Sequence, residues 1–331
     1  MPVANPPFNV AVLGCWHVHA EDYARSAAAH PDTTLVAAYD PDPALVRPLA
    51  QHLGVEPTDD LDALLAREDV HGVTVTTETT AHTDVISRAL AAGKHVFTEK
   101  LLAPTVQECE RLVARAADAG LALVVSLPRL YAGYTLAVRD LLDSGELGTL
   151  THGRVRLSHD GAVHGRDGGV GGWLPDRFFD PAPAVGGALT DLGCHPVYLT
   201  QLFLGADPQT VRAVYANVTP RDVEDHAVVT VGYDDGRIGV VEAGFVSDDA
   251  FTIDVHGTEG SVHYTDAGRR LWRRYPDGRT EDLTVPPDAP DAFAQWVQHA
   301  AAGTRATENL RRAVDLTRLV VRANHAAGTK E

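Results

Sequence analysis

Short apolar runs alternate with alanine-rich, amphipathic segments over the first 126 residues. The runs are apolar over several consecutive positions, which is typical of parallel strands buried between two layers of helices. They comprise residues 8–14, 34–40, 72–77, 95–98 and 121–126. The segments between them predict helices at residues 19–30, 61–67, 82–92 and 105–120. Strands and helices that alternate in this way predict a doubly wound parallel sheet.

The pattern changes after about residue 126, where longer runs with alternating character begin. Six of them predict strands: residues 151–159, 210–218, 226–233, 238–245, 251–256 and 261–264. Asp234-Asp235-Gly236 and Thr258-Glu259-Gly260 are typical of hairpin turns, so this sheet is expected to be mostly antiparallel. Such sheets are often open on one face, and we expect an α+β domain with a large open sheet.

We therefore expect two domains, residues 1–126 and 127–331. Two further helices are predicted between residues 289 and 327, and they could pack back on the first domain. A glycine- and proline-rich stretch at residues 160–185 suits either a mobile loop over a site or a plain surface excursion. A length of 331 residues is itself long for one hydrophobic core.

The composition excludes several kinds of partner. A formal net charge of −17 argues against nucleic acid or an anionic membrane surface, and no apolar run is long enough to span a membrane. Cys15, Cys109 and Cys194 lie far apart and offer no disulfide framework, which favours a reducing cytosol. Residues 1–9 lack the features of a signal peptide. We expect a cytoplasmic globular protein.

Gly14 and Asp40 end the first two apolar runs, which is the layout of a Rossmann dinucleotide-binding unit. Asp40 could accept hydrogen bonds from both ribose hydroxyls, and its charge would repel a 2′-phosphate, so we expect NAD rather than NADP. The fingerprint G-x-G-x-x-G is incomplete, however, because Trp16 and His19 stand where its second and third glycines belong. These two side chains leave open how closely the backbone could approach a pyrophosphate.

His17 and His19 offer a competing chemistry in the same loop. Two histidines that follow a strand could ligate a metal ion, with His82 or His195 completing the set. Histidines in loops more often form hydrogen bonds or contact a substrate, and we expect no metal site.

A carboxylate and an imidazole stand four residues apart in the stretch from Gly186 to His195. If the stretch is helical, Asp191 and His195 project from one face, one turn apart. A neutral imidazole can accept a proton near physiological pH, and a carboxylate beside it can orient the ring. The same pattern also fits an ordinary helix with one ion pair. Pro196 predicts that the helix kinks or restarts just after His195.

Four segments together resemble the Gfo/Idh/MocA family of oxidoreductases, which includes glucose-fructose oxidoreductase and inositol dehydrogenase. Residues 93–100 end in Glu99-Lys100 and are followed by Leu101, where the family has Glu-Lys-Pro. The other similar segments are Thr77-x-x-x-x-His82, Ser144-Gly145-Glu146-Leu147-Gly148 and residues 186–195. The resemblance covers nearly the whole chain.

The resemblance implies a role for each matching residue. Lys100 would donate a hydrogen bond to the substrate hydroxyl, His195 would be the general base, and Asp191 would hydrogen-bond the substrate and hold the other two. Oxidation of a secondary alcohol needs such a base, an electrostatic partner for the alkoxide and a hydride acceptor. The residues expected to bind NAD are Gly14, Trp16, His17, Asp40, Thr77, His82, Glu99 and Lys100.

Several residues near the expected pocket are candidates for contacts with a sugar-like substrate, although structural roles fit them as well. They are His19, Arg129, Tyr131, His164, Arg166 and Trp173. The open sheet favours a homodimer or homotetramer.

The hypothesis is an NAD-dependent oxidoreductase that acts on a secondary alcohol or ketone of a sugar, inositol or related polyol. Because the glycine fingerprint is incomplete, an alternative on the same fold is a redox-neutral or metal-assisted lyase, isomerase or hydrolase that uses His17 and His19. A non-catalytic relative is disfavoured, since it would have no need for Lys100, Asp191 and His195 together.

Overall fold

The computed structural model describes residues 8–165 and 171–328, which form two compact units. The first unit comprises Met1–Ser126 and Pro290–Val314, and the second comprises Leu127–Ala289 and Asp315–Glu331. The chain therefore returns to the first unit near its end. Among the described residues, no helix has the length and apolar character needed to cross a membrane.

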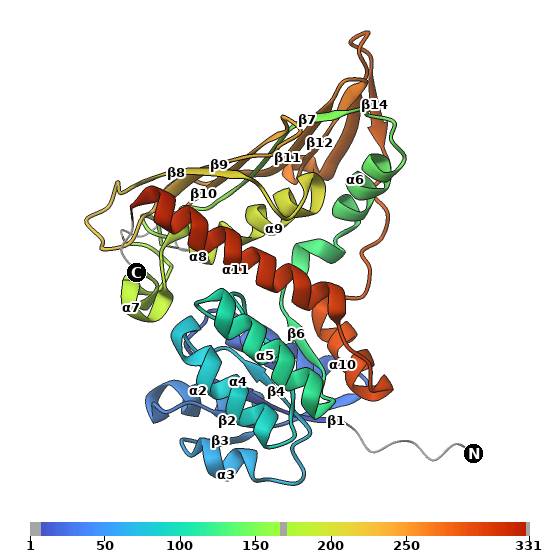
Figure 1. Cartoon of the computed structure of the whole chain (residues 1–331). Coiled ribbons are helices and arrows are strands. Elements are labelled where there is room, and N and C mark those ends of the chain that lie inside the picture. Colours follow the sequence, from blue (N-terminus) through green and yellow to red (C-terminus); the bar gives the residue numbers. More distant parts are fainter. Residues whose placement is uncertain (1–7, 166–170, 329–331) are drawn as a thin grey trace. The chain divides into compact units, whose positions relative to one another are not determined.

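The first unit is built on a six-stranded parallel sheet in the order β3-β2-β1-β4-β5-β6 (Figure 1). Its strands are β1 (Phe8–Leu13), β2 (Thr33–Tyr39), β3 (Glu56–Thr58), β4 (Gly72–Val75), β5 (His95–Thr98) and β6 (Leu123–Val125). Its helices are α1 (Ala20–Ala29), α2 (Pro43–Leu53), α3 (Leu61–Leu65), α4 (His82–Ala91), α5 (Val106–Ala119) and α10 (Ala292–Ala302). The strand order reverses between β1 and β4, and ligands of such sheets bind at the carboxyl ends of the strands beside this reversal.

Buried apolar side chains explain why the C-terminal segment joins this unit. Phe293 and Trp296 of α10 pack on Phe97 of β5, with ring centroids 5.5 and 6.0 Å apart. At the sheet edge, the Asn309 side chain accepts a hydrogen bond from Val125 N–H (2.8 Å) and donates one to Val125 O (2.9 Å). This amide satisfies a backbone edge that would otherwise lack partners.

The second unit contains an eight-stranded sheet in the order β14-β13-β12-β11-β7-β10-β9-β8. The strands are β7 (Leu150–Ser158), β8 (Thr210–Ala216), β9 (His226–Gly232), β10 (Ile238–Gly244), β11 (Asp249–Gly257), β12 (Gly260–Thr265), β13 (Arg270–Arg274) and β14 (Thr280–Leu283). β7 pairs in parallel with β10, and the other neighbours are antiparallel.

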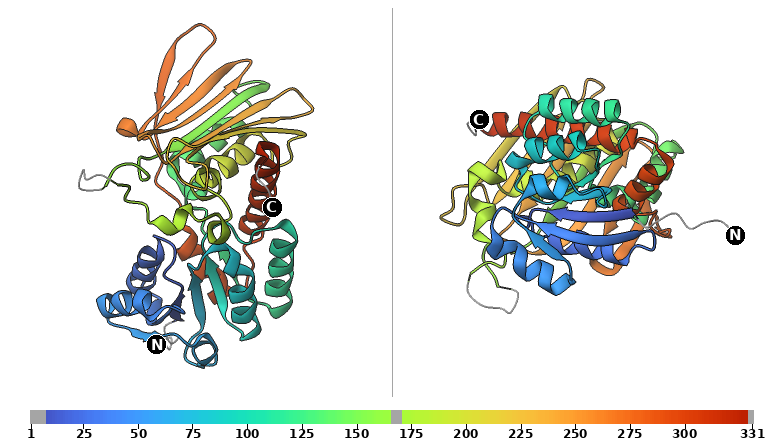
Figure 2. Two further views of the ribbon diagram at one scale, coloured as in Figure 1. Left: turned by 90° about the vertical axis from the view of Figure 1, so that its left-hand side faces the viewer. Right: turned by 90° about the horizontal axis from the view of Figure 1, so that it is seen from below.

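α9 (Cys194–Leu204) packs on one face of this sheet, against its central strands β7 and β10 (Figure 2). Val229 and Val231 of β9 are buried, whereas Val228 and Thr230 are exposed, so alternate residues face opposite sides. The other helices are α6 (Gly133–Asp143), α7 (Pro181–Ala184), α8 (Ala188–Asp191) and α11 (Thr307–Ala327), which runs from the first unit into the second.

The predicted fold class is confirmed: a doubly wound parallel sheet is followed by a mostly antiparallel one. β3, α2, β13 and β14 were not predicted. β13 (Arg270–Arg274) and β14 (Thr280–Leu283) carry many charges and exposed positions, so they lack the apolar run that marks a buried strand. The glycine- and proline-rich stretch contains a short 3₁₀ helix at Asp176–Phe179 followed by α7.

Candidate active site

Gly14 makes the turn that leaves β1. Its φ is +90°, and a Cβ there would lie 2.5 Å from Thr77 Cγ2 and 2.6 Å from Thr77 N. Because part of that contact is with backbone, no side-chain movement could relieve it. The position therefore requires glycine, and the turn holds the loop after β1 against the loop after β4.

The loop then reaches α1 without the other two glycines of the fingerprint. His17 N–H donates to Thr76 O (3.0 Å), and α1 begins at Ala20 with no side-chain cap on its N-terminus. His19 is 45% exposed and its Nδ1 lies 2.8 Å from Asp22 Oδ2. Trp16 is partly exposed. The amides that begin α1 have no side-chain cap, as at the helix N-termini that bind pyrophosphate.

Asp40 directly follows β2 and is only 4% exposed. Its carboxylate accepts hydrogen bonds from Cys15 N–H (2.6 Å) and Asp42 N–H (2.8 Å). The first of these bonds ties the carboxylate to the residue after Gly14. Asp40 is therefore fixed at the carboxyl end of β2, beside the turn after β1.

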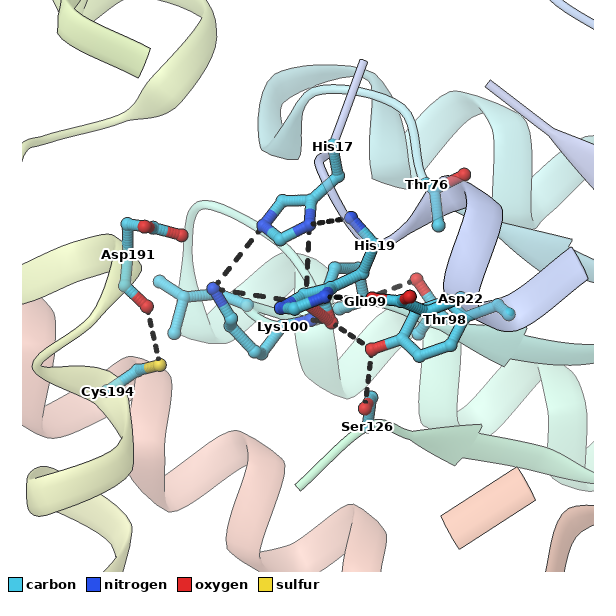
Figure 3. A network of polar contacts seen from close by, with 12 residues as sticks. His17, His19, Asp22, Thr76, Thr98, Glu99, Lys100, Ser126, Asp191 and Cys194 are labelled. Carbon is cyan, nitrogen blue, oxygen red and sulfur yellow. Dashed lines mark hydrogen bonds and ion pairs between the residues drawn. The ribbon is translucent and has the colours of Figure 1, made fainter. Parts of the chain in front are cut away.

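Glu99 and Lys100 follow β5 and form a buried polar cluster with His17, shown in Figure 3. Lys100 Nζ lies 3.5 Å from His17 Nε2 and 3.9 Å from Glu99 Oε1. Glu99 Oε1 also lies 3.6 Å from His17 Nδ1. Glu99 Oε2 accepts hydrogen bonds from Lys100 N–H (3.0 Å) and from the Tyr23 hydroxyl (2.8 Å). The Glu99 carboxylate therefore interacts with His17, Lys100 and Tyr23 at the same time.

The charges of this cluster determine its protonation. Burial raises the pKa of Glu99, but the neighbouring His17 and Lys100 outweigh burial, and its pKa is lowered overall. Burial, reinforced by the charge of Glu99, raises the pKa of Tyr23 well above its usual value, so the hydroxyl stays protonated and can donate. The carboxylate is therefore ionised in the interior, where it can stabilise a cation at Lys100 Nζ.

His17, His19 and Glu99 also form the one group of ligand type found among residues 8–165 and 171–328, with three donor atoms within 4.8 Å of one another. The Lys100 ammonium lies beside two of these groups and would compete with a metal ion for them. His82, which the metal alternative invoked to complete the set, does not do so, because both of its ring nitrogens face backbone carbonyls.

His82 instead connects two loops of the site. Its Nδ1 lies 2.8 Å from Leu101 O and its Nε2 lies 3.2 Å from Thr77 O. Burial lowers the pKa of His82, and the hydrogen bonds to the two carbonyls only partly offset that effect. The Lys100–Leu101 peptide is cis. His82 therefore links the loop after β4 to the residue that follows Lys100.

In the second unit, Asp191 and His195 do not lie on one continuous helix, so that expectation is wrong. α8 ends at Asp191, and α9 begins at Cys194 after a break at Leu192 and Gly193. A Cβ on Gly193 would lie 2.8 Å from Leu189 O and 2.9 Å from Ala243 Cβ of β10. The break thus precedes His195 rather than following it. Pro196 lies in the first turn of α9, where a missing N–H costs no helical hydrogen bond.

Glu224 holds the N-terminus of α8. Its carboxylate accepts hydrogen bonds from Gly187 N–H (3.1 Å) and Leu189 N–H (3.0 Å), and its backbone carbonyl accepts one from Ala188 N–H (2.9 Å). A Cβ on Gly187 would lie 2.2 Å from Glu224 O, so the close approach needs glycine. Burial raises the pKa of Glu224, partly offset by the amide donors. Glu224 therefore positions the helix that ends in Asp191.

His195 is held by Tyr198, one turn further along α9. His195 Nδ1 lies 2.9 Å from the Tyr198 hydroxyl, which also accepts a hydrogen bond from Arg129 N–H (3.1 Å). Tyr198 is 1% exposed, and burial raises its pKa well above the usual value. Across the break, the Cys194 thiol at the start of α9 donates to Asp191 O at the end of α8 (2.9 Å).

The residues expected to contact substrate have the following surroundings. The Arg129 guanidinium lies over the Phe251 ring (4.1 Å) and donates to Tyr134 Oη (3.1 Å). Trp173 packs on His159, with ring centroids 4.7 Å apart. Tyr131 is partly buried and His164 is exposed. Arg166 lies outside the described residues. Substrate contacts by these residues remain predictions.

Three positioning residues of the two units were missed by sequence reasoning: Tyr23, Tyr198 and Glu224. Tyr23 and Tyr198 resemble ordinary buried aromatic residues of a helix. Glu224 is separated by 35 residues in the sequence from Leu189, whose backbone N–H donates a hydrogen bond to it. Only Tyr198, three residues after His195, had a spacing that could have been noticed.

Comparison with known proteins identifies the family. Residues 8–127 match the oxidoreductase family with an NAD-binding Rossmann fold, and residues 135–263 match the GFO/IDH/MocA C-terminal domain. The chain belongs to the GFO/IDH/MocA family. The expected family, and with it the expectation of an NAD(P)-binding oxidoreductase, is confirmed.

Two relatives are both dTDP-3,4-didehydro-2,6-dideoxy-alpha-D-glucose 3-reductases. The one from Streptomyces violaceoruber is 30% identical over 311 residues, which is 89% of this chain and 86% of that protein. The one from Actinomadura kijaniata is 32% identical over 222 residues, which is 67% of this chain but only 64% of that protein, less than two thirds of its length.

Two solved structures are similar over almost the whole chain. GenD2 from gentamicin A biosynthesis, in complex with NAD, has a TM-score of 0.82 and 26% identity, covering 98% of this chain and 95% of its own. KijD10, a 3-ketoreductase from Actinomadura kijaniata in complex with NADP and TDP-benzene, has a TM-score of 0.82 and 25% identity, covering 97% and 98%. The two complexes contain different cofactors, so the family alone leaves the choice of NAD or NADP open.

Proposed function

We propose that this oxidoreductase transfers hydride between NAD and a secondary alcohol or ketone of a sugar or polyol. The observation that carries the proposal is the set of groups at the carboxyl ends of the parallel strands: the Gly14 turn, Asp40 after β2 and Glu99-Lys100 after β5. The curated relatives named above reduce a dTDP-linked keto sugar, which supports a carbohydrate substrate.

The residues of the first unit fit a dinucleotide. Gly14 makes the tight turn after β1 that such a site needs, and the first amides of α1 have no side-chain cap. Each Asp40 oxygen accepts one backbone N–H and has lone-pair capacity for a ribose hydroxyl. The negative charge would oppose a 2′-phosphate, which favours NAD over NADP. When bound, the cofactor accepts or supplies the hydride.

The proton of the reaction is handled by this chain's own groups. We assign Lys100, Asp191 and His195 to the substrate oxygen: the amine and the imidazole hydrogen-bond to it, and one of them exchanges its proton. Glu99 and His17 hold the amine of Lys100, and Glu224 holds the helix that carries Asp191. His19, Arg129, Tyr131, His164, Arg166 and Trp173 remain candidates for contacts with the rest of the substrate.

Cofactor choice is tested with Asp40→Asn, which removes the charge at nearly constant volume. Fluorescence titration with NADH and NADPH should show the native protein binding NADH more tightly. In the variant we expect the ratio of the two dissociation constants to move toward NADPH by about tenfold, the effect of one hydrogen bond and its charge. Asp59→Asn, a change of the same charge at an exposed position, is the control. An unchanged ratio would contradict the assignment of Asp40.

The substrate class is tested by measuring NADH oxidation and NAD reduction with free sugars, inositols and nucleotide-linked keto sugars. Turnover of at least one member, lost in Lys100→Met with NADH still bound, supports the proposal. Binding of neither nicotinamide cofactor would remove it.

We further propose a cytoplasmic homodimer or homotetramer. Val214, Val218 and Val228 are exposed on or beside β8 and β9, which suits an intersubunit contact, and none of the three cysteines forms a disulfide. Light scattering coupled to gel filtration tests the assembly, and a monomer at micromolar concentration would contradict it.

A further inference from the structure

The Tyr198 hydroxyl has two hydrogen-bond partners within the described part of the chain. It accepts from Arg129 N–H (3.1 Å), a backbone donor that cannot reverse its role, and it lies 2.9 Å from His195 Nδ1. The side chain is buried, so water does not compete for the hydroxyl. The two rings meet edge to face, with centroids 5.6 Å apart, which fixes their mutual orientation.

Counting protons on this hydroxyl determines the form of the imidazole. A tyrosine hydroxyl has one proton, and Arg129 N–H already occupies one of its acceptor positions. Burial keeps the hydroxyl protonated by raising its pKa. Its proton must therefore point at His195 Nδ1, or else remain buried without an acceptor. When Nδ1 accepts this bond, the single proton of a neutral imidazole is on Nε2.

We propose that Tyr198 is a positioning residue that holds His195 in its Nε2–H tautomer, so that His195 donates a hydrogen bond to the substrate oxygen instead of accepting its proton. This role differs from the general base that the family resemblance implies. The identity of the substrate oxygen rests on the proposed function, whereas the tautomer follows from the contacts of Tyr198 alone.

The proton is then exchanged by Lys100. In the reductive direction a bound nicotinamide cofactor would supply a hydride to the carbonyl carbon, and the electron pair of the C=O π bond would move to oxygen. That oxygen takes a proton from the Lys100 ammonium, which becomes a neutral amine and regains a proton from water. His195 stabilises the negative charge on oxygen throughout and keeps its own proton. In the oxidative direction the same steps run in reverse, with neutral Lys100 as the base.

The tautomer can be observed without any substrate. Protein labelled with ¹⁵N-histidine is compared by long-range ¹H–¹⁵N NMR with His195→Gln, whose missing signals assign His195 among the 16 histidines. We expect the native ring, when neutral, to have a bare Nδ1 and a protonated Nε2. In Tyr198→Phe we expect a mixture of tautomers. A native ring protonated at Nδ1 would overturn the proposal, whether or not the protein proves to be a sugar oxidoreductase.

Kinetics test the role of the donor, using the best substrate of the panel above. Glutamine at position 195 can place an N–H near the Nε2 position but cannot take up a proton. We expect His195→Gln to retain about a tenth of the native kcat/KM, and His195→Ala to lose about 100-fold or more, the usual effect of removing one donor to an oxyanion. Equal loss in the two variants would overturn the proposal.

The link between the two residues is tested by combining variants. Tyr198→Phe should lower kcat about tenfold, the cost of freeing one buried hydrogen bond, and should add little further loss to His195→Gln, which has no tautomers. The control is Tyr215→Phe, which loses a tyrosine hydrogen bond to Asn324 Oδ1 (2.8 Å) in the same unit. Fully multiplicative losses in the double variant would show that Tyr198 does not act through His195.

Discussion

Replacing Glu224 should weaken both the fold of the second unit and catalysis, although Glu224 touches no reacting group. The Glu224 carboxylate is buried and accepts the amides of Gly187 and Leu189 at the start of α8. Glu224→Ala leaves both amides without their acceptor. An orphaned buried amide costs about 1–3 kcal/mol and a lost cap about 0.5–2 kcal/mol. Because these terms overlap, we expect a loss of about 2–4 kcal/mol in the free energy of unfolding.

Glu224→Gln keeps the volume but can satisfy only one of the two amides, so we expect a loss of about 1–2 kcal/mol at low pH. The sign of the pH dependence follows from the raised pKa of Glu224, which burial causes. As the pH rises above the usual glutamate value, the unfolded chain ionises first and the native carboxyl later. The native protein therefore loses stability over that window, and its advantage over Glu224→Gln shrinks.

Urea unfolding and hydrogen exchange of the peptide that spans residues 187–193 provide the assay. For Glu224→Ala we expect faster hydrogen exchange at the start of α8 and a lower urea midpoint. We also expect kcat to fall about tenfold or more, because Asp191 would be misplaced. Asp222→Asn, an exposed carboxylate two residues earlier, is the matched control. If Glu224→Ala showed the same hydrogen exchange and the same urea midpoint as Asp222→Asn, the reasoning would be refuted.

Two further predictions concern the first unit. Gly14→Ala should destabilise the protein by about 3 kcal/mol or more and abolish NADH binding, because φ is +90° and the new Cβ would lie 2.6 Å from Thr77 N. Urea unfolding measures the loss of stability, and fluorescence titration measures NADH binding. A urea midpoint equal to that of the native protein would contradict the prediction. His82→Gln should flatten the pH dependence of stability: burial lowers the pKa of His82, so the unfolded chain takes up a proton first and native stability falls as the pH drops below about 6.5. Urea midpoints measured at pH 7.5 and 5.5 test this. If the midpoint changed by the same amount between the two pH values in the native protein and in His82→Gln, the prediction would be contradicted.

The parallel sheet could be predicted because every buried strand in it is marked by consecutive apolar residues, as in β1 and β4. The charged edge strands β13 and β14 could not, because their pairing depends on hydrogen bonds to β12 and to each other rather than on burial of apolar side chains. The same limit applies to α2, whose interior Pro48 obscures a helical pattern.

The candidate site shows a similar division. Gly14 and Asp40 could be placed from sequence because each ends a predicted strand, and Lys100 because it lies two residues after one. The break at Gly193 could not, since no local pattern reveals that Gly193 lies close to Ala243 of β10, where a Cβ would not fit. Pro196 suggested a break, but after His195 rather than before it. Glu224 and Tyr198 act through hydrogen bonds to particular backbone and ring atoms, which no local pattern encodes.

The central proposal is that Lys100 and His195 act on one substrate oxygen beside a nicotinamide. Single-turnover reduction of the best substrate, followed by the loss of NADH absorbance after stopped-flow mixing, tests it most directly. We predict that Lys100→Met and His195→Ala each slow this step about 100-fold or more, that the double variant is hardly slower than either one, and that NADH still binds all three. Hydride transfer at the native rate in Lys100→Met would contradict the account.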